Sequence, residues 1–464
     1  MKKRSLIYLV SMLAGLVMAA LLPASIAFAK ESPPSLEEMW RIIKQQQAEI
    51  DELKAQNALL KEKIDQVPAQ GAPAEVAATP PPASASKAED KSGTVMDIYG
   101  HVMTDMGYQV NQNDPDWFDV VRPTKLPSFE NEFGDDGNFF SSVRQTRFGV
   151  KTATPTSYGD LKTIFEFELF GVGDDAGQTT FRLRHAWGEL GQFGAGQYWS
   201  TFMDIDVFPN SIEYWGPNGM VFYRNVQARW TPWSVGDSRF AVSLERPGAS
   251  GDGGKYADAP ELEGVGGDFE LPDLAAHFRY AQDWGHVQLA GILRQIQWTD
   301  PNNDGFDFSG DELGWGFNLS SNYRIGPHVL RGSLVYGEGI QNYMNDASVD
   351  IGVVEQGGLP IGVEPIPIFG LVAFLDLNWS EKWTSTIGYS LQDNDLTNGQ
   401  SGNSFKKGQY ALTNLLWHPT PNFFVGPELQ WAKRDNFLDG FSSDDFRIQV
   451  SAKWSYSKTF GLSK

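Results

Sequence analysis

Basic side chains recur on one face of the segments in which apolar and polar residues alternate. Successive side chains of an extended strand point to opposite sides, so Arg182 and Arg184 share a side, about 6–7 Å apart along the strand. By the same parity a larger set points away from the apolar side: Arg147, Lys151, Arg182, Arg184, Arg229, Arg279, Arg294, Arg331, Arg447 and Lys453. Guanidinium groups bind carboxylates through paired hydrogen bonds, and such charges lower the barrier for anions in a narrow channel. The pattern therefore predicts a surface that guides anions.

The same arginines have a purely structural alternative. Glu166 and Glu168 lie on the polar side of their own segment, and acids also occur in the loops, so ion pairs could simply stiffen the wall. Arginine outnumbers lysine at these positions, which favours recognition of planar carboxylates because the guanidinium fork matches them. Both interpretations stay open, since pore charges commonly serve both purposes.

A second set of charged residues lies in the segment 201–220, which is rich in Phe, Tyr and Trp. Such a segment is too aromatic for an ordinary outer loop, because exposed aromatic rings are costly in water. Folding it into a barrel would bury the rings and narrow the lumen. Asp204, Asp206 and Glu213 would then face the arginines as a constriction loop with a transverse field. A subunit-contact loop explains the aromatic residues alone equally well.

Catalytic and metal-binding motifs are not found. The six histidines lack H-E-x-x-H or comparable spacing, and neither G-x-S-x-G nor a phosphate-binding loop occurs. No cysteine is present, so a thiol nucleophile and a cysteine metal site are excluded. An outer-membrane hydrolase would need a Ser–His pair, and the sequence singles out none. We expect no enzymatic activity, no metal and no cofactor, and the net charge of −21 argues against nucleic acid.

Alternation with a period of two dominates residues 94–464. In the last segment Phe446, Ile448 and Val450 share an apolar side opposite Arg447 and Gln449. We expect about sixteen strands, an even number as single-chain bacterial barrels require. They are placed near residues 95–109, 142–152, 160–170, 179–190, 193–200, 221–231, 238–246, 273–282, 286–298, 312–324, 329–338, 368–379, 383–392, 408–417, 422–433 and 445–460.

The connections between these segments alternate between short and long. Short turns occur at residues 191–192, 283–285, 325–328, 380–382 and 418–421, and long loops at 110–141, 201–220, 247–272, 299–311, 339–367, 393–407 and 434–444. A bacterial outer-membrane barrel has short periplasmic turns and long outer loops, whereas a soluble sandwich has no reason to sort its loops. The fold class is therefore predicted to be all-β, a transmembrane antiparallel barrel in a Gram-negative outer membrane. It would contact lipid and lipopolysaccharide.

The N-terminal 93 residues divide into three segments of different character. Residues 1–29 have a basic start, an apolar middle and an A-x-A end, which predict a cleaved signal peptide. Residues 34–67 carry a heptad repeat, which predicts a periplasmic α-helical coiled coil. Residues 68–93 are rich in Pro and Ala and predict a linker. The oligomerisation positions within the heptads are Ile43, Ile50, Leu53, Asn57, Leu60 and Ile64.

These features resemble the DcaP-type trimeric porins. The resemblance rests on the heptad helix, the linker, the opening D-I-Y-G-H-V at residues 97–102 and the run R-L-R-H-A-W at 182–187. It implies a homotrimer with a periplasmic coiled coil and an arginine-lined pore for small anions, dicarboxylates in particular. Two features depart from it. Four residues follow Phe460, whereas such barrels usually end on this aromatic residue. In the heptads, Ile at position a with Leu at position d favours two-stranded coiled coils and not trimers.

The sequence is compatible with three functions. The first is a passive porin with anion preference, carried by the basic lumen face. The second is a general or cation-leaning porin, motivated by the acidic total. The third is a structural tether in the outer membrane, in which the coiled coil and linker matter more than the pore.

Overall fold

The computed structural model describes residues 93–302 and 307–462. The predicted signal peptide (1–29), the coiled coil (34–67) and the linker up to residue 92 lie outside the described residues. So do the predicted oligomerisation positions Ile43, Ile50, Leu53, Asn57, Leu60 and Ile64. The structure therefore leaves these assignments as predictions.

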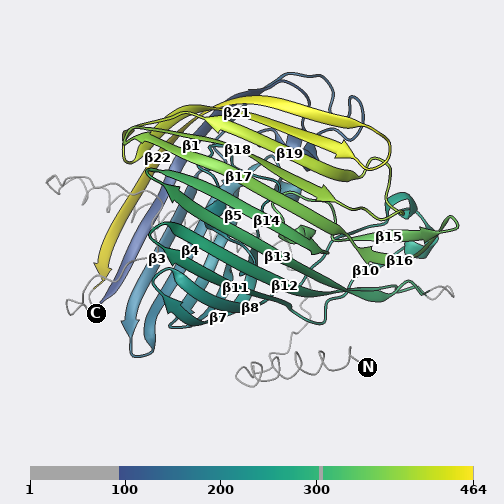
Figure 1. Ribbon diagram of the computed structural model, residues 1–464, viewed down its shortest axis with the longest axis horizontal. Helices are drawn as coiled ribbons and strands as arrows, with labels where there is room; N and C mark the ends of the chain where they lie inside the picture. The colour runs from purple at the N-terminus through teal and green to yellow at the C-terminus, as the bar shows by residue number, and fades with distance from the viewer. Residues whose placement is uncertain (1–92, 303–306, 463–464) are drawn as a thin grey trace, which may run out of the picture. The chain divides into compact units, whose positions relative to one another are not determined.

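The described residues form one closed antiparallel barrel. The first strand pairs with the last along its whole length, from Thr94 opposite Leu462 to Gln109 opposite Arg447, and this pairing closes the sheet (Figure 1). Of the 19 segments in this sheet, β2, β10 and β20 continue neighbouring strands, which leaves the sixteen strands that were expected. These are β1 (Thr94–Gln109), β3 (Arg147–Thr156), β4 (Gly159–Phe170), β5 (Thr179–Leu190), β6 (Phe193–Trp199), β7 (Arg224–Val235), β8 (Ser238–Glu245), β11 (Asp273–Gln282), β12 (Gly285–Thr299), β13 (Gly310–Ile325), β14 (His328–Glu338), β17 (Pro367–Ser380), β18 (Trp383–Asn394), β19 (Phe405–Asn414), β21 (Phe423–Asn436) and β22 (Ser442–Leu462).

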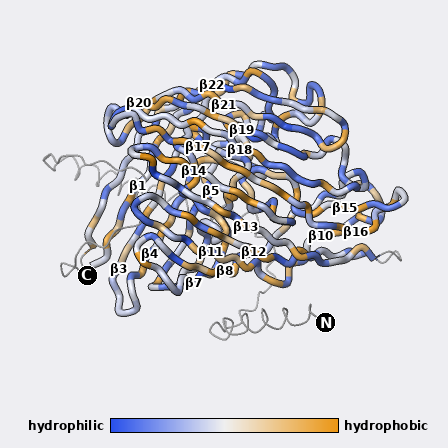
Figure 2. Tube along the Cα trace, in the orientation of Figure 1, coloured by the Kyte–Doolittle hydropathy of each residue, from blue (hydrophilic) through white to orange (hydrophobic). Residues whose placement is uncertain are grey.

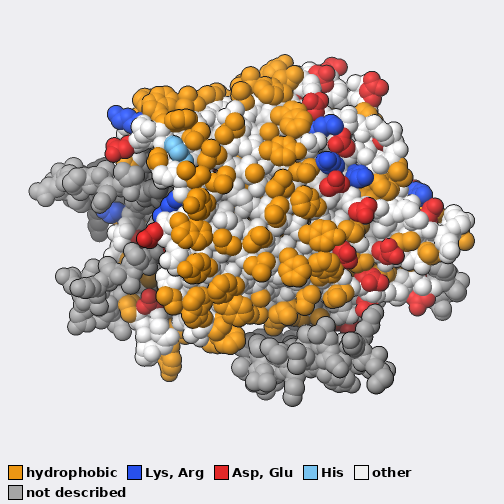
Figure 3. Space-filling view, in the orientation of Figure 1, with side chains coloured by type: hydrophobic (Ala, Val, Ile, Leu, Met, Phe, Trp, Pro, Cys, Tyr) orange, Lys and Arg blue, Asp and Glu red, His pale blue; other side chains and the backbone are white. Residues whose placement is uncertain are grey.

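Side chains alternate between the outside and the inside of this wall. On β22, Ile448 and Val450 are exposed, whereas Arg447 and Gln449 are buried inside. Apolar and polar residues alternate along the strands in Figure 2, and apolar side chains cover the wall in Figure 3. Lipid can cover such a wall, and closure leaves no unpaired strand edge in the hydrocarbon. The alternation read from the sequence thus predicts the two faces correctly.

Many strand ends differ from the prediction by a few residues, and three of the differences follow directly from the pairing. Residues 143–146 form a turn, so the expected strand 142–152 divides into β2 (Asn138–Ser142) and β3, both paired with β1. The expected strand 408–417 divides into β19 and β20 (Leu416–Thr420), because the pairing breaks at residue 415. At the C-terminus, Gly461 and Leu462 continue β22 beyond Phe460 by pairing with Val95 and Thr94.

Long loops gather at one end of the barrel and carry short elements of their own. A three-stranded sheet of β9 (Gly251–Asp252), β15 (Ile351–Gln356) and β16 (Leu359–Pro365) lies there, and charged side chains gather on this end in Figure 3. The other elements between barrel strands are β10 (Gly266–Gly267), η1 (Pro115–Trp117), η2 (Pro123–Lys125), η3 (Gly173–Asp175), η4 (Ile205–Val207), η5 (Gly254–Tyr256), η6 (Pro260–Leu262) and η7 (Gln341–Tyr343). No helix in the described part of the chain is long and apolar enough to span a membrane.

Three loops fold into the barrel and share a core with its wall. We name them L1 (residues 110–137), L3 (200–223) and L6 (339–350). Their apolar side chains pack on small and aromatic residues that point inward from β11, β12, β17 and β19. The members of this core are Val121 and Leu126 of L1; Phe202, Met203, Val207, Met220 and Val221 of L3; Ile340, Tyr343 and Met344 of L6; and wall residues including Ala275, Ile292, Phe374 and Tyr410.

Candidate pore constriction

L3 is anchored to the barrel wall through its backbone. Two backbone N–H groups, those of Ile212 and Glu213, donate to the Glu428 carboxylate of β21 at 2.9 and 3.1 Å. At the start of the loop, the N–H of Thr201 donates to Glu245 of β8 at 2.8 Å. Hydrogen bonds from a neutral donor to a carboxylate are stronger than those between neutral groups. The loop is therefore held against the wall at its start and at its middle.

Asp204 and Asp206 meet Arg279 at the beginning of L3. Asp204 accepts hydrogen bonds from His286 Nε2 at 2.7 Å and Arg279 Nη1 at 3.2 Å, and Asp206 accepts from Arg279 Nη2 at 2.5 Å. The Ser320 hydroxyl also donates to Asp204, at 2.7 Å. Burial alone would raise the pKa of Asp204, but the bonds from His286 and Arg279 hold that pKa below its ordinary value. Both carboxylates thus face an arginine of the wall.

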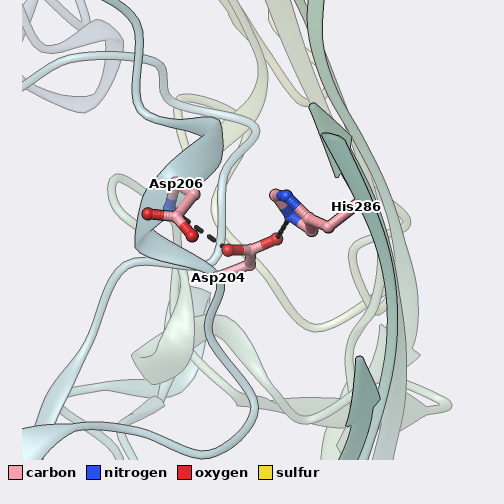
Figure 4. A group of neighbouring side chains, drawn as sticks. All are labelled: Asp204, Asp206 and His286. Atoms are coloured by element: carbon pink, nitrogen blue, oxygen red, sulfur yellow. Dashed lines mark hydrogen bonds and ion pairs between the residues drawn. The ribbon is translucent and has the colours of Figure 1, made fainter. Parts of the chain in front are cut away.

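Asp204, Asp206 and His286 are also near enough to one another to hold a metal ion (Figure 4). Their possible ligand atoms lie within 4.8 Å of one another. The Arg279 guanidinium, however, already contacts both carboxylates and supplies the positive charge that such a pair requires. This geometry favours an anchoring ion pair over a metal centre.

Glu213 forms no ion pair with an arginine among the described residues, although the charge of Arg447 acts on its carboxylate. Its carboxylate accepts hydrogen bonds from the backbone N–H groups of Val121, Trp215 and Gly216 and from the Tyr410 hydroxyl. Burial raises the pKa of Glu213 to about 7. The residue therefore organises L1 and L3, with Arg447 of the wall as a nearby cation. Its sequence neighbours Tyr214 and Trp215 make the contacts with arginines.

L1 and L6 pack with L3 inside the barrel, and no sequence motif singled them out. The Arg122 guanidinium of L1 lies against the rings of both Trp117 and Trp215, at 4.2 and 4.1 Å from their centroids. It also forms an ion pair with Asp346 of L6 at 2.8 Å. Arg122 therefore joins all three inward loops. The adjacent aromatic residues Trp117 and Phe118 of L1 were the available signal in the sequence, because exposed rings are costly in water.

Four arginines converge on two glutamates in the wall beside L3. Glu168 lies 2.6 Å from Arg184, and the second glutamate, Glu166, lies 2.7 Å from the same guanidinium. The remaining contacts to Glu168 are with Arg147 at 3.3 Å, Arg182 at 3.9 Å and Arg224 at 3.8 Å. Four guanidinium groups against two carboxylates leave an excess of positive charge. We call these six residues the arginine cluster.

Two members of the arginine cluster remain open to solvent. The side chains of Arg147 and Arg182 are 27% and 24% exposed, whereas Arg184 and Arg224 are buried behind them. The Tyr214 hydroxyl of L3 donates to Glu168, so L3 contacts the cluster directly. Arg224 was not among the predicted residues, because the expected strand 221–231 gave no reason to single out its first residues.

The other predicted basic residues point inward but have different surroundings. Arg331 is partly exposed and pairs with Asp376 at 2.5 Å. Lys151 and Arg229 lie against aromatic rings, 4.6 Å from the centroid of Tyr99 and 5.3 Å from that of Trp187. An aromatic ring attracts a cation but does not neutralise its charge, so both side chains keep a full positive charge at the wall. These residues can add positive charge along the path without forming part of the cluster.

Arg294 and Arg447 do not line open solvent, which corrects the prediction for both. Both point inward but are fully buried. Arg294 lies under L6, where it pairs with Asp273 at 3.0 Å and Asp350 at 2.8 Å. Arg447 lies over the Phe140 ring at 3.9 Å and donates to the backbone carbonyl of Asp119 in L1. The alternation along a strand predicts the side on which a residue lies. It does not predict whether an inward-folded loop covers that residue.

Arg294→Met should therefore destabilise the barrel without changing its ion selectivity. The substitution leaves two buried carboxylates without their cation, and breaking a buried pair in this way typically costs about 3–5 kcal/mol. Denaturant titration of the purified protein in detergent measures the change in the free energy of unfolding. Arg331→Met, at a partly exposed pair, is the matched control and should cost less than about 1 kcal/mol. A selectivity change in Arg294→Met would instead place Arg294 on the ion path.

Solved structures share this architecture. The crystal structure of the outer membrane channel DcaP of Acinetobacter baumannii is 21% identical to the chain and has a TM-score of 0.65, and the match covers 80% of this chain and 100% of that one. The anion-selective porin from Comamonas acidovorans is 12% identical, with a TM-score of 0.50, and the match covers 78% of this chain and 100% of that one. At these identities the likeness concerns the fold.

Sequence comparison identifies a family for the chain but no individual curated relative. No curated protein sequence matches the chain. The family model described as DcaP outer membrane protein matches residues 29–456, which is most of the chain. The closed barrel of sixteen strands and the inward L3 agree with this match. The chain belongs to the DcaP outer membrane protein family.

Proposed function

We propose that this outer-membrane channel admits small anions by passive diffusion, with dicarboxylates as its preferred class. The arginine cluster is the observation that carries the proposal. Its four guanidinium groups exceed its two carboxylates, and Arg147 and Arg182 keep part of their surface in contact with solvent. A fixed positive charge at a narrow point favours anions, and a guanidinium can hold a carboxylate by two parallel hydrogen bonds.

Two separated carboxylates suit this wall better than one. Arg147 and Arg182 both contact Glu168, so their free N–H groups lie on one part of the wall. The partly exposed Arg331, which donates to the backbone carbonyl of Asp206 in L3, offers a further cation inside the barrel. A short dicarboxylate can therefore contact one group while it leaves the other, which keeps binding weak enough for passage.

Succinate added to chloride solution should reduce the chloride current in planar bilayers. The dianion competes for the guanidinium groups and occupies the path for longer, because two charge-assisted contacts form in place of one. Arg182→Gln should weaken this block several-fold. Acetate, which has a single carboxylate, is the control and should block less. Equal block by acetate and succinate would refute the preference for dicarboxylates.

A general or cation-leaning porin is the second candidate, and one observation favours it. The side chain of Asp206 on L3 is 47% exposed, and acids gather at the long-loop end of the barrel (Figure 3). Exposed carboxylates at the mouth attract cations. Asp206 is, however, paired with Arg279, which reduces its field. The sign of the reversal potential in a salt gradient decides between the two kinds of channel.

The N-terminal segments are proposed to hold the channel as a homotrimer through a periplasmic coiled coil. The heptads of residues 34–67 supply the self-association, and the linker of residues 68–93 gives the barrel freedom relative to it. A pure tether would depend on these segments alone.

Removing residues 30–93 should leave the channel conductance unchanged. The barrel closes on itself through β1 and β22, so the pore does not need the N-terminal segments. Single-channel recording of the shortened protein, with size-exclusion chromatography of both forms, measures conductance and assembly together. A polar replacement of Ile43, Ile50 and Leu60 is the matched control for the heptads. Loss of conductance in a folded shortened barrel would favour the tether.

A further inference from the structure

Two arginines of the lumen face keep their charge without an acidic partner. Arg229 of β7 and Arg239 of β8 are partly exposed, and strand alternation turns both inward, since their neighbours Trp230 and Phe240 lie exposed on the outer face. Neither arginine forms an ion pair in the part of the chain that the structure describes. Arg239 is an inward arginine that the sequence pattern did not single out. Both side chains therefore present a charge that is available to an anion.

Arg239 is fixed in orientation by a neutral histidine. Its Nε group donates to Nε2 of His277 at 3.2 Å, and Nδ1 of His277 lies 2.8 Å from the backbone carbonyl of Thr201 at the start of L3. Because a carbonyl only accepts, the histidine proton lies on Nδ1, and the ring that Arg239 contacts is uncharged. The two Nη groups of Arg239 form no hydrogen bond among the described residues, and neither is one of the side-chain atoms that are shut off from solvent. The open edge of this guanidinium is therefore accessible from the lumen.

Arg229 is also held by neutral groups. Its Nε and Nη2 groups donate to Oε1 of Gln227 at 3.1 and 3.0 Å, and Nη2 also donates to the backbone carbonyl of Trp199. The rings of Trp187 and Tyr198 lie against the guanidinium, with centroids at 5.3 and 5.6 Å. These contacts orient the side chain and leave its charge in place. The Nη1 group is neither hydrogen-bonded among the described residues nor shut off from solvent.

The acids around this pair are engaged elsewhere. The charge of Glu245 acts on Arg229, but this carboxylate is buried and accepts hydrogen bonds at the start of L3. The two aspartates of L3 act on Arg239 in the same way, but both pair with Arg279. An anion that reaches Arg229 and Arg239 would therefore not have to displace a carboxylate. At the arginine cluster, by contrast, it competes with Glu166 and Glu168.

The pair lies on the short-turn side of the arginine cluster. Arg224, a member of that cluster, is the first residue of β7, and Arg229 follows five residues later, about 16 Å further along the strand. Arg239 is the second residue of β8, directly after the short turn at residues 236–237, and lies opposite Arg279 of β11. A solute that enters from the long-loop end would therefore meet the arginine cluster first and this pair afterwards.

We propose that Arg229 and Arg239 form a second carboxylate site, which receives an anionic solute after it leaves the arginine cluster. The open edge of Arg239 binds a carboxylate by two parallel hydrogen bonds, and the charge of Arg229 adds to the attraction. Two sites in series keep each binding step weak enough for release. This site rests on the proposed passage of anions and assigns its second step to residues outside the arginine cluster.

The test measures how succinate blocks the chloride current of the purified full-length protein in planar bilayers. Replacing both Arg229 and Arg239 by Gln should raise the half-blocking succinate concentration at least about threefold, because the charge-assisted contacts are lost. The same double substitution should raise it by the same factor in the Arg182→Gln background, since sites more than roughly 7–10 Å apart act independently. Loss of that factor in the Arg182→Gln background would place the pair within the arginine cluster and overturn a second site.

Two further variants separate the contact from the charge and from the lumen. Arg239→Lys keeps the charge but removes the planar fork, so it should weaken the block while the reversal potential in potassium chloride stays unchanged. Lys458→Gln removes a charge from the outer face and should leave the block unchanged.

Failure of this site is distinguishable from failure of the proposed function. Unchanged block in the folded double variant, with a wild-type channel that is anion-selective and blocked by succinate, would refute the second site alone. A wild-type channel that succinate does not block would refute both. Heat-modifiable migration on gels reports the folded barrel, and Arg229→Gln alone serves as the variant should the double substitution fail to fold.

Discussion

Removing residues 204–213 from L3 should raise the single-channel conductance by roughly twofold or more, because the loop occupies the lumen that it narrows. The apolar residues of L3 are buried in the core that it shares with the wall, and its backbone is bonded to Glu428 and Glu245. Without these residues the arginine cluster faces a wider, more hydrated path. Planar-bilayer recording of the purified variant in symmetrical salt measures the change.

A matched deletion separates this effect from a general loss of loops. Shortening the tip between β15 and β16, at residues 356–359, removes an exposed segment from the long-loop end without touching L3. Its conductance should equal that of the wild type. Unchanged conductance after removal of residues 204–213 would show that L3 does not limit the ion path.

Replacing both Arg147 and Arg182 by Glu should reverse the ion preference of the channel. The change converts four guanidinium groups and two carboxylates into two guanidinium groups and four carboxylates at one part of the wall. Charges in a narrow, partly dehydrated lumen act through a lower effective dielectric constant than in water. We expect the anion-to-cation permeability ratio to fall at least about tenfold. Reversal potentials in a salt gradient measure this ratio.

The control for this pair lies on the other side of the wall. Lys458 of β22 is exposed at the short-turn end, on the same face as the lipid-facing Tyr456 and Phe460. Lys458→Glu makes the same kind of charge reversal outside the lumen and should leave selectivity unchanged. An equal shift from Lys458→Glu would mean that overall charge, and not the arginine cluster, sets the preference.

Alternation in the sequence was sufficient to predict the barrel and the sides of its wall. A period of two fixes which side chains share a face, so the inward positions of Arg182, Arg184 and Arg447 were predicted correctly. The strand ends were less well predicted, because the break at residue 415 and the turn at 143–146 depend on pairing with distant strands.

The interior of the barrel was only partly predictable. The aromatic content of L3 indicated that it folds inward, and the contacts of Asp204 and Asp206 with Arg279 agree with that expectation. The inward positions of L1 and L6 could not be predicted, because no local pattern joins Arg122 to Asp346, which lie more than 200 residues apart. For the same reason the sequence did not reveal that L6 covers Arg294.

The reversal potential of the wild-type channel tests the central claim most directly. The purified protein is placed in a planar bilayer between two potassium chloride solutions of different concentration, and the zero-current potential is measured. A potential of the sign set by chloride is the predicted result, because the arginine cluster carries excess positive charge at the constriction. A potential of the sign set by potassium would contradict the anion preference and favour the cation-leaning porin.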